Sequence, residues 1–484
     1  MTVLAVPLLV LSTLAQTPAP RDLVARAVTA MGGETAVRGL RGSAIDFYQA
    51  MFALGQEETP ASPARANLTV GRQVTDYAGN RMLITTEGRN PTGAVNNVRR
   101  VIAGSIGMTE TNGVPAPDNP GQVATLERFM RRTPERLLLT ALDNPAALRP
   151  VPARRWRDET LDGVRYAARA DTLDLYFDRR TGLLVLTETL TDDPILGDRV
   201  TRTAFTRWQD ADGVLLWRQL DVEVNNRLQN HSVATAISTN PALSDSMFAI
   251  PDSIAARAQR SDATPPPVVV TLVELAPNVW RAEGGTHHSL IVDQGARLVV
   301  VEAPLNAMRM EAMLDTLRSR FPGKPVGLVI NTHHHWDHSG GLRAVLAAGV
   351  PVVTQARNVS FVRSIATARK TIRPDVLSRR LGPARPPFPA ISAVEDSLVV
   401  GRGDGQVIAY RLPTTHAEGM LAVYVPSARI LFQSDVVNAM PTPPAAGSAE
   451  LVRFVKARGI TVDRVAGGHG VVLPWADVER AAAP

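Results

Sequence analysis

Apolar and polar residues alternate through much of the first half of the chain, which predicts β-strands. In residues 171–191, Leu173, Leu175 and Phe177 occupy alternate positions before turn residues 179–182, so this segment predicts a hairpin. Residues 201–225 repeat the plan around a second turn at 210–213. Helical spacing appears at 21–33, which ends in Gly32-Gly33, and again at 126–142. The pattern predicts an α+β, mainly antiparallel β domain.

Strand patterns alternate with helical ones in the second half. Residues 289–304 predict two strands, and residues 306–324 predict an amphipathic helix with Asn306 as its N-cap. A short buried strand at 325–331, a helix at 341–349 and another strand at 350–354 follow. Alternation of this kind is typical of an α/β layer structure.

A change of composition separates the two halves. Residues 252–268 are small and polar and end in Pro265-Pro266-Pro267, which predicts a linker. The expected domains are therefore a β-rich N-terminal domain at 21–251 and an α/β domain at 269–484.

The first twenty residues have the features of a secretory signal. Residues 3–15 form a short apolar run that ends in Thr13-Leu14-Ala15, and a proline-containing polar stretch follows. We expect residues 1–20 to be a signal peptide and the protein to be periplasmic or secreted. The alternative is a buried N-terminal strand. No segment is long and apolar enough to predict a membrane-spanning helix in the mature protein.

Composition excludes several kinds of chemistry. The chain has no cysteine, so disulfides, thiolate metal sites and cysteine nucleophiles are absent. The net charge is +6, and only three of the 52 basic residues are lysine. The arginines are spread along the chain without a dense basic run, which argues against nucleic acid as a partner and favours a solvated surface.

Residues 331–341, NTHHHWDHSGG, hold four of the nine histidines. They lie between a predicted strand and a predicted helix, where α/β sheets place their sites. Side chains two apart in an extended segment face the same way, so His333, His335 and Asp337 share one side, and His338 follows at the turn. Imidazole and carboxylate donors suit zinc, and also iron or manganese. This segment is therefore a candidate metal site.

Three further residues have the same strand-end placement. His416, Asp435 and His469 each follow an apolar strand pattern. Ligands so placed would converge on one edge of a sheet.

This pattern resembles the metallo-β-lactamase superfamily over residues 270–484. The resemblance implies an αββα sandwich with two zinc ions. His333, His335 and His416 would bind the first metal ion, Asp337, His338 and His469 the second, and Asp435 would bridge them. His334 would be packed or support the ligands. His287 and His288 would contact substrate or brace the loop.

Two close divalent ions imply hydrolysis. Water shared between them loses a proton near neutral pH and attacks an ester, lactone, lactam or similar bond. Asp337 would position this nucleophile and accept its proton. Asp435 places the chain with the glyoxalase-II-like, lactonase-like and sulfatase-like branches. The Asp-Thr-Gly of many relatives is replaced by Glu302-Ala303-Pro304.

The N-terminal half loosely resembles periplasmic lipoprotein-carrier half-barrels. The likeness rests on the first helix, Met31-Gly32-Gly33 and the segment FDRRTGLL at 177–184. It implies a cavity for an apolar ligand; the alternative is a docking domain. Two other functions stay open: a mononuclear iron oxygenase, as in persulfide dioxygenases, or a ligand-binding protein with a vestigial metal domain. The expected partner is a small molecule, apolar or anionic.

Overall fold

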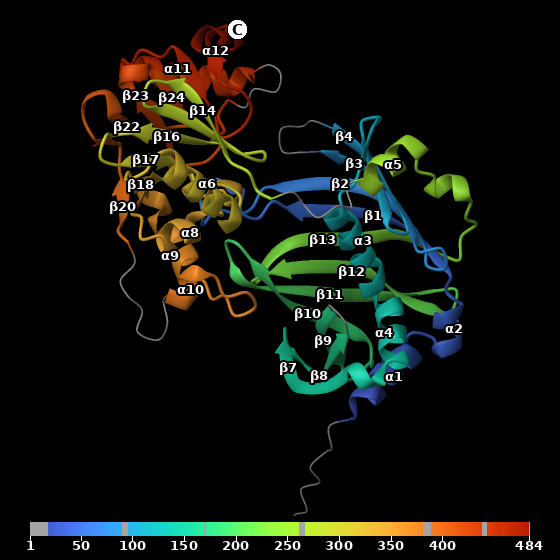
Figure 1. Cartoon of the computed structure of the whole chain (residues 1–484). Helices are drawn as coiled ribbons and strands as arrows, with labels where there is room; N and C mark the ends of the chain where they lie inside the picture. Colours follow the sequence, from blue (N-terminus) through green and yellow to red (C-terminus); the bar gives the residue numbers. More distant parts are fainter. Residues whose placement is uncertain are drawn as a thin grey trace, which may run out of the picture.

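The computed structural model describes residues 18–89, 95–168, 171–260, 267–380, 389–437 and 443–483. Two domains lie side by side (Figure 1). The predicted signal peptide falls outside the described residues except for its last three, of which Pro20 begins helix α1.

The N-terminal domain is built on one antiparallel sheet of thirteen strands, in the order β6-β5-β4-β3-β2-β1-β13-β12-β11-β10-β9-β8-β7. Strands that are consecutive in sequence are paired, except for β6 and β7, which form the two edges, and the β1–β13 pairing joins the two halves of the sheet. The strands are β1 (Gly42–Phe52), β2 (Ala66–Asp76), β3 (Arg81–Arg89), β4 (Val95–Ala103), β5 (Ile106–Thr111), β6 (Val114–Pro117), β7 (Leu148–Trp156), β8 (Glu159–Ala168), β9 (Asp171–Asp178), β10 (Leu184–Asp193), β11 (Gly197–Ala211), β12 (Val214–Val224) and β13 (Arg227–Thr239).

Helices cover one face of this sheet (Figure 1). They are α1 (Pro20–Ala30), α2 (Glu34–Gly39), α3 (Pro120–Arg132) and α4 (Pro134–Asp143). Leu23, Val24 and Ala27 of α1 are buried in a core that they share with α4 and strands β8 and β9. The single helical stretch expected at 126–142 is divided between α3 and α4. Thr133 is extended there, because the residue before a proline avoids the helical region.

The predicted linker is in part a helix. Residues 252–260 form α5 (Asp252–Arg260), which contacts β5 and β6. Ile254 and Ala258, one helical turn apart, are both buried. The sequence of this segment is dominated by small and polar residues, so its apolar stripe was not recognised as helical. The prolines at 265 and 266 lie outside the described residues.

The C-terminal domain has two sheets that pack face to face between helices, as the αββα expectation requires. The first contains β14 (Thr271–Ala276), β15 (Val279–Glu283), β16 (Ser289–Asp293), β17 (Leu298–Val301), β18 (Val326–Ile330), β19 (Val352–Gln355) and β20 (Ile391–Val394). The second contains β21 (Ser397–Val400), β22 (Val407–Leu412), β23 (Met420–Val425), β24 (Ile430–Phe432), β25 (Arg464–Ala466) and β26 (Leu473–Pro474).

Three cores hold these layers together. Val292, Val301 and Phe432 belong to the core between the two sheets, and none of them is exposed. The first sheet is also covered by α6 (Ala307–Arg320), α7 (Trp336–Ser339), α8 (Leu342–Ala347), α9 (Val359–Thr367) and α10 (Val376–Arg380). The second is covered by α11 (Ala445–Arg458) and α12 (Trp475–Ala482). Strands β17 to β20 run parallel, so their carboxyl ends meet at one edge.

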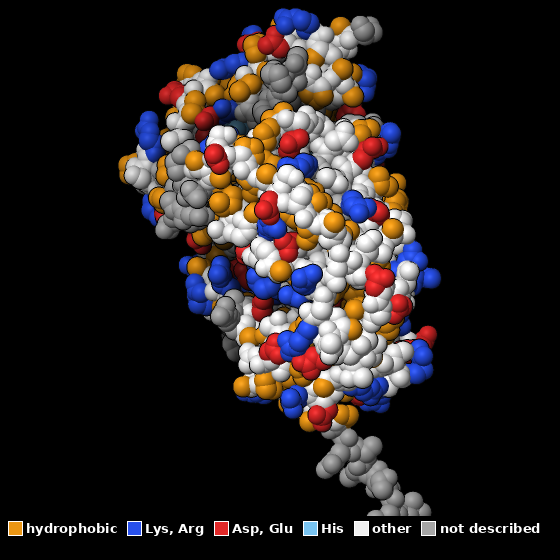
Figure 2. Space-filling view, turned by 90° about the vertical axis from the view of Figure 1, so that its right-hand side faces the viewer, with side chains coloured by type: hydrophobic (Ala, Val, Ile, Leu, Met, Phe, Trp, Pro, Cys, Tyr) orange, Lys and Arg blue, Asp and Glu red, His pale blue; other side chains and the backbone are white. Residues whose placement is uncertain are grey.

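The surface fits the charge prediction. Basic and acidic side chains are interspersed over the face shown in Figure 2. Among the described helices, none combines the length and apolar character needed to cross a lipid bilayer.

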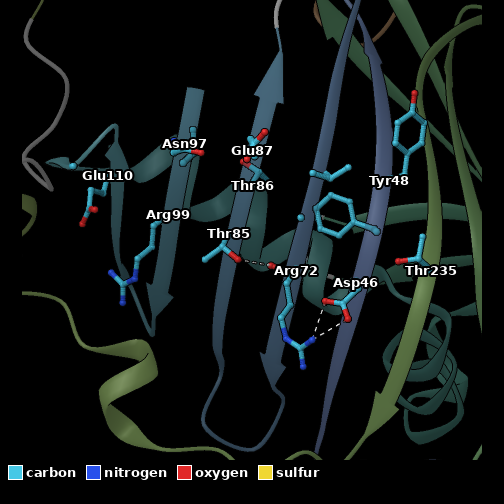
Figure 3. A pocket seen from close by; sticks show the side chains of 15 residues that line it. Asp46, Tyr48, Arg72, Thr85, Thr86, Glu87, Asn97, Arg99, Glu110 and Thr235 are labelled. Carbon is cyan, nitrogen blue, oxygen red and sulfur yellow. Dashed lines mark hydrogen bonds and ion pairs between the residues drawn. The ribbon is translucent and has the colours of Figure 1, made fainter. Parts of the chain in front are cut away.

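A hollow of about 650 Å³ lies on strands β1 to β5 of the N-terminal sheet (Figure 3). Tyr48 and Val70 contribute apolar surface, but Asp46, Arg72 and Arg99 also line it. Arg72 and Asp46 form an ion pair of 2.8 Å. The lining of this hollow is therefore mixed, with charged side chains beside the apolar surface.

Candidate metal centre

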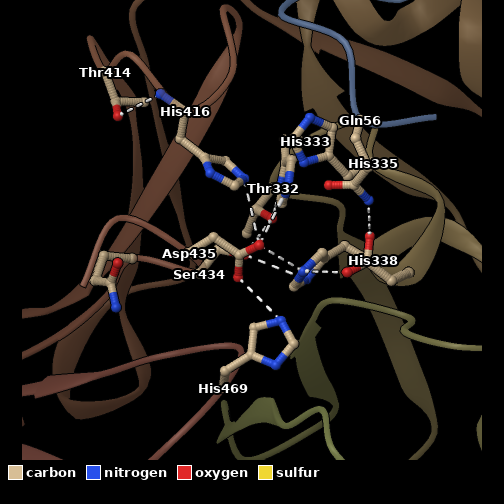
Figure 4. A network of polar contacts seen from close by, with 12 residues as sticks. Gln56, Thr332, His333, His335, His338, Thr414, His416, Ser434, Asp435 and His469 are labelled. Atoms are coloured by element: carbon tan, nitrogen blue, oxygen red, sulfur yellow. Dashed lines mark hydrogen bonds and ion pairs between the residues drawn. The ribbon is translucent and has the colours of Figure 1, made fainter. Parts of the chain in front are cut away.

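The histidine-rich segment leaves the buried strand β18 and enters the short helix α7. Residues 331–335 are extended and lie below the surface, with His333 and His335 no more than 1% exposed. The other candidates arrive from the second sheet. His416 follows β22, Asp435 follows β24 and His469 follows β25. Strand ends of both sheets thus bring all seven predicted ligands to one edge. Figure 4 labels six of them, all except Asp337.

Asp435 lies at the centre of the cluster. Its Oδ2 atom is 2.9 Å from His338 Nε2, 3.3 Å from His416 Nε2 and 4.0 Å from His333 Nε2. Its Oδ1 atom is 3.5 Å from His469 Nε2. The carboxylate therefore lies between two sets of donors, the position expected of a bridging ligand.

The donor atoms form two groups, each compact enough to hold one cation. One consists of His333, His335, His416 and Asp435, and the other consists of His287, Asp337, His338 and His469. This is the division that the family resemblance implies, with His287 added to the second group. A third combination, Glu302 with His333 and His338, shares its two histidines with these groups.

Most of the histidines have one ring nitrogen occupied and the other directed into the cluster. His335 Nε2 lies 2.9 Å from the Glu57 carbonyl, His338 Nδ1 lies 2.9 Å from Glu302 Oε2, and His469 Nδ1 lies 3.1 Å from the Thr286 carbonyl. Such contacts fix the tautomer and the ring orientation of metal-binding histidines.

The nitrogens left over are suited to a metal ion. Among the described residues, His333 Nε2, His335 Nδ1 and His416 Nε2 are buried without a hydrogen-bond partner. Burial, reinforced by His416, lowers the pKa of His335 to about 3, so its imidazole is neutral at neutral pH. Neutral imidazole is the form that binds metal. Unpaired buried polar atoms are costly, and a divalent cation would pair them.

Carboxylates supply the complementary negative charge. Burial raises the pKa of Asp435, but His338 and the other histidines outweigh it and lower that pKa well below its usual value. Burial likewise opposes ionisation of Asp337, yet hydrogen bonds from His287 and Gln56 and the charge of His338 keep its pKa low. Both carboxylates are ionised, which favours a bound cation.

Glu302 replaces the aspartate of many relatives and is fully buried. Its Oε1 atom accepts hydrogen bonds from Thr332 Oγ1, at 2.6 Å, and from Ser434 Oγ, while Oε2 faces His338. Burial lowers the pKa of His338, but Glu302 and Asp435 outweigh it and raise that pKa well above its usual value. Glu302 therefore orients His338 and links both sheets.

The three remaining predicted histidines differ in position. His287 Nε2 lies 3.1 Å from Asp337 Oδ2, and its ring centroid is 3.9 Å from that of His469. His287 therefore belongs to the cluster itself. The backbone N–H of His288 donates to the Gly468 carbonyl, which braces the loop that carries His469. His334 belongs to neither group and packs edge-on against Phe361.

Sequence reasoning missed the contribution of the N-terminal domain. The loop 53–65 between β1 and β2 reaches the cluster, where Gln56 Nε2 donates to Asp337 Oδ1 at 2.7 Å (Figure 4). The Glu57 carbonyl contacts His335, and Gly55 lies against the Trp336 ring. The loop sequence, ALGQEETPASPAR, carries no motif that marks it as part of a site.

Part of the chain is similar to known proteins. Residues 282–469 match the family model of the metallo-beta-lactamase superfamily. The chain is 28% identical over 165 residues to acyl-coenzyme A thioesterase MBLAC2 of Gallus gallus, covering 33% of this chain and 57% of that protein. It is 26% identical over 164 residues to 2,4-dinitroanisole O-demethylase subunit alpha of Nocardioides sp. (strain JS1661), covering 34% and 45%.

These matches span about half the length of either relative. Among solved structures, a metallo-beta-lactamase from Pontibacter korlensis is 20% identical, with a TM-score of 0.34 and coverage of 43% of this chain and 95% of that one.

Proposed function

Because residues 282–469 match the family model of the metallo-beta-lactamase superfamily, we propose that the protein is a metal-dependent hydrolase with two zinc ions. His333, His335 and His416 would hold the first ion, and Asp337, His338 and His469 the second, with Asp435 between them. The single observation that carries the proposal is the convergence of buried, unpaired ring nitrogens on Asp435. An all-nitrogen-and-oxygen donor set without cysteine suits zinc.

When bound, two such ions would polarise a substrate carbonyl and make water reactive near neutral pH. The protein's own groups set the geometry. Asp337 is the catalytic candidate, because its side chain is 34% exposed whereas Asp435 is 6% exposed. It can orient an attacking water and accept its proton. Gln56 donates a hydrogen bond to Oδ1 of this carboxylate, and His287 Nε2 lies against Oδ2.

The bond cleaved would be an ester, lactone, lactam or related acyl bond. The relative named as an acyl-coenzyme A thioesterase supports acyl transfer to water. The presence of Asp435 favours the branches of the superfamily that carry a bridging aspartate over the zinc β-lactamases. β-Lactams are therefore tested after esters and lactones.

Metal content tests the proposal first. Elemental analysis of full-length protein purified without chelator should give about two zinc ions per chain, and fewer for Asp435→Ala. Asp404→Ala, at an exposed turn, is the control and should keep the parent content. The parent should also hydrolyse at least one of 4-nitrophenyl acetate, a γ-lactone and nitrocefin. One iron per chain, unaffected by Asp435→Ala, would point to oxygen chemistry, and no bound metal would refute the proposal.

We also propose that the protein is exported, because of the apolar run at 3–15 and its small-residue end. N-terminal sequencing of protein from the periplasm and medium should find a start between residues 15 and 21. Full-length chain confined to the cytosol would contradict export.

A further inference from the structure

A second cavity, of about 330 Å³, lies between the two domains. Its walls come from the loop after β1, the turn between β10 and β11, the start of β13, the metal-binding loop and helix α9. Ile195, Leu196, Trp336 and Phe361 make much of its lining apolar. A volume of this size with mainly apolar walls is typical of a small-molecule site.

His334 is the polar group that the metal-site assignment leaves unexplained. It lines the cavity and is 1% exposed. The Glu57 backbone lies near the imidazole, but neither ring nitrogen makes a hydrogen bond of normal geometry with the residues that the structure describes. A neutral imidazole has one donor and one acceptor, and leaving both unpaired in a buried place is costly. A bound ligand with a polar atom would remove that cost.

The cavity shares its walls with the candidate metal centre. Glu57 lines the cavity, and its carbonyl oxygen contacts His335 Nε2 at 2.9 Å. Trp336 lines the cavity and directly precedes Asp337, the most exposed carboxylate of the cluster. A ligand in the cavity therefore lies against the loop that holds the metal ligands.

The cavity is held in shape by charge as well as by packing. Arg227 forms an ion pair with Glu57, whose side chain is almost fully buried, and Glu57 also accepts from the backbone N–H of Gly55. These contacts hold loop 53–65 in place. Both domains are thus needed to form the cavity.

We propose that this cavity binds the apolar part of the substrate, a group of medium size whose one hydrogen-bonding atom pairs with His334. The assignment to substrate rests on the proposed hydrolase function. The inference that the cavity is a ligand site rests on its volume, its apolar walls and the unpaired imidazole of His334. It explains why a metallo-beta-lactamase domain is packed against a second domain at its metal loop.

Binding of N-phenyl-1-naphthylamine, a neutral fluorescent amine, tests the site without any reaction. Zinc-loaded full-length protein would be titrated as parent, as Leu196→Trp, which fills the cavity, and as Val70→Trp. Val70 lines the hollow on the N-terminal sheet, so the control adds the same ring elsewhere. We expect Leu196→Trp to weaken binding about tenfold and Val70→Trp to leave it within about twofold.

His334→Leu removes both ring nitrogens at similar size. It should weaken binding of the amine by about three- to tenfold, the loss of one hydrogen bond, with metal content unchanged. If Leu196→Trp fails to fold by circular dichroism, Ala368→Leu, directly after helix α9, narrows the cavity with a smaller side chain. A parent that does not bind the amine, or a loss found only with Val70→Trp, would overturn the proposal.

Hydrolysis connects the site to substrate. The ratio of kcat/KM for 4-nitrophenyl hexanoate to that for 4-nitrophenyl acetate should fall about tenfold in Leu196→Trp and stay unchanged in Val70→Trp. An unchanged ratio in Leu196→Trp would refute the assignment to substrate. If the parent hydrolyses neither ester while the amine titrations behave as expected, the proposed hydrolase function fails and the ligand site stands.

Discussion

Gln56 in the N-terminal domain donates a hydrogen bond of 2.7 Å to Asp337, the exposed carboxylate of the candidate metal centre. The two residues are 281 positions apart. The bond engages Oδ1, while Oδ2 faces His287 and His338. Gln56 thereby fixes which oxygen of Asp337 is turned towards the cluster.

Gln56→Ala should weaken metal binding at the second group of ligands by about tenfold, because outer contacts that orient a ligand carry effects of this size. Titration against a chromophoric zinc chelator measures both affinities. The first group should keep its affinity. Gln73→Ala, on the N-terminal sheet, removes a side-chain amide that bonds only Thr75 among the described contacts and is the control. Equal affinities in Gln56→Ala and the parent would contradict the positioning role.

Gly55→Ala should destabilise the protein by more than the backbone cost alone. Gly55 has a φ of +84°, and a Cβ atom there would lie 2.1 Å from the Trp336 ring. Gly113 has a φ of +83° with nothing near its Cβ position, so Gly113→Ala measures the backbone cost, about 1–2 kcal/mol. In guanidinium unfolding, Gly55→Ala should lose about 1–3 kcal/mol more. An equal loss of unfolding free energy in the two variants would show that loop 53–65 moves aside without an added cost.

Glu302→Ala should lower the free energy of unfolding by about 3–5 kcal/mol, because it leaves buried hydrogen-bonding groups next to both sheets without a partner. Thr332 Oγ1, Ser434 Oγ and His338 Nδ1 would all lose their acceptor. Measuring unfolding in the presence of a metal chelator separates this loss of stability from any effect on metal binding. Asp315→Ala, which breaks an exposed pair with Arg318, should cost little. A similarly small loss for Glu302→Ala would show that the network contributes no stability.

Stability should depend on Asp375 in acid. Burial raises its pKa, but hydrogen bonds from Arg343 and Ser378 outweigh that effect and lower it to about 2. The ionised form is thus favoured on folding, so its contribution is complete above pH 4 and is lost as pH falls towards 2.

Asp375→Asn should therefore lower the free energy of unfolding by about 2 kcal/mol at pH 7, with a difference that narrows below about pH 4. Urea unfolding at several pH values measures this. Asp404→Asn, at an exposed turn, is the control. A difference that stays constant with pH would contradict the ion-pair explanation.

The sequence by itself determined the class of both domains and the candidate ligands. Strand and helix periods are local properties, so the antiparallel sheet and the αββα layers could be predicted from them. His333, His335, Asp337 and His338 occupy one short segment, and their spacing on an extended chain already places them together. His416, Asp435 and His469 were identifiable because each ends an apolar strand, and strand ends gather at a sheet edge.

Only the tertiary structure decided how the centre is completed. Gln56 and Glu57 reach it through contacts between distant parts of the chain, and neither residue type nor loop spacing marks such contacts. His287 joined the second group of ligands because the loop before β16 is hydrogen-bonded to the loop after β25 that carries His469. Helix α5 replaced part of the predicted linker because Val101 of β4 and Met108 of β5 offer an apolar surface to Ile254. Local patterns specify elements and donors, whereas packing between domains specifies which side chains hold those donors in place.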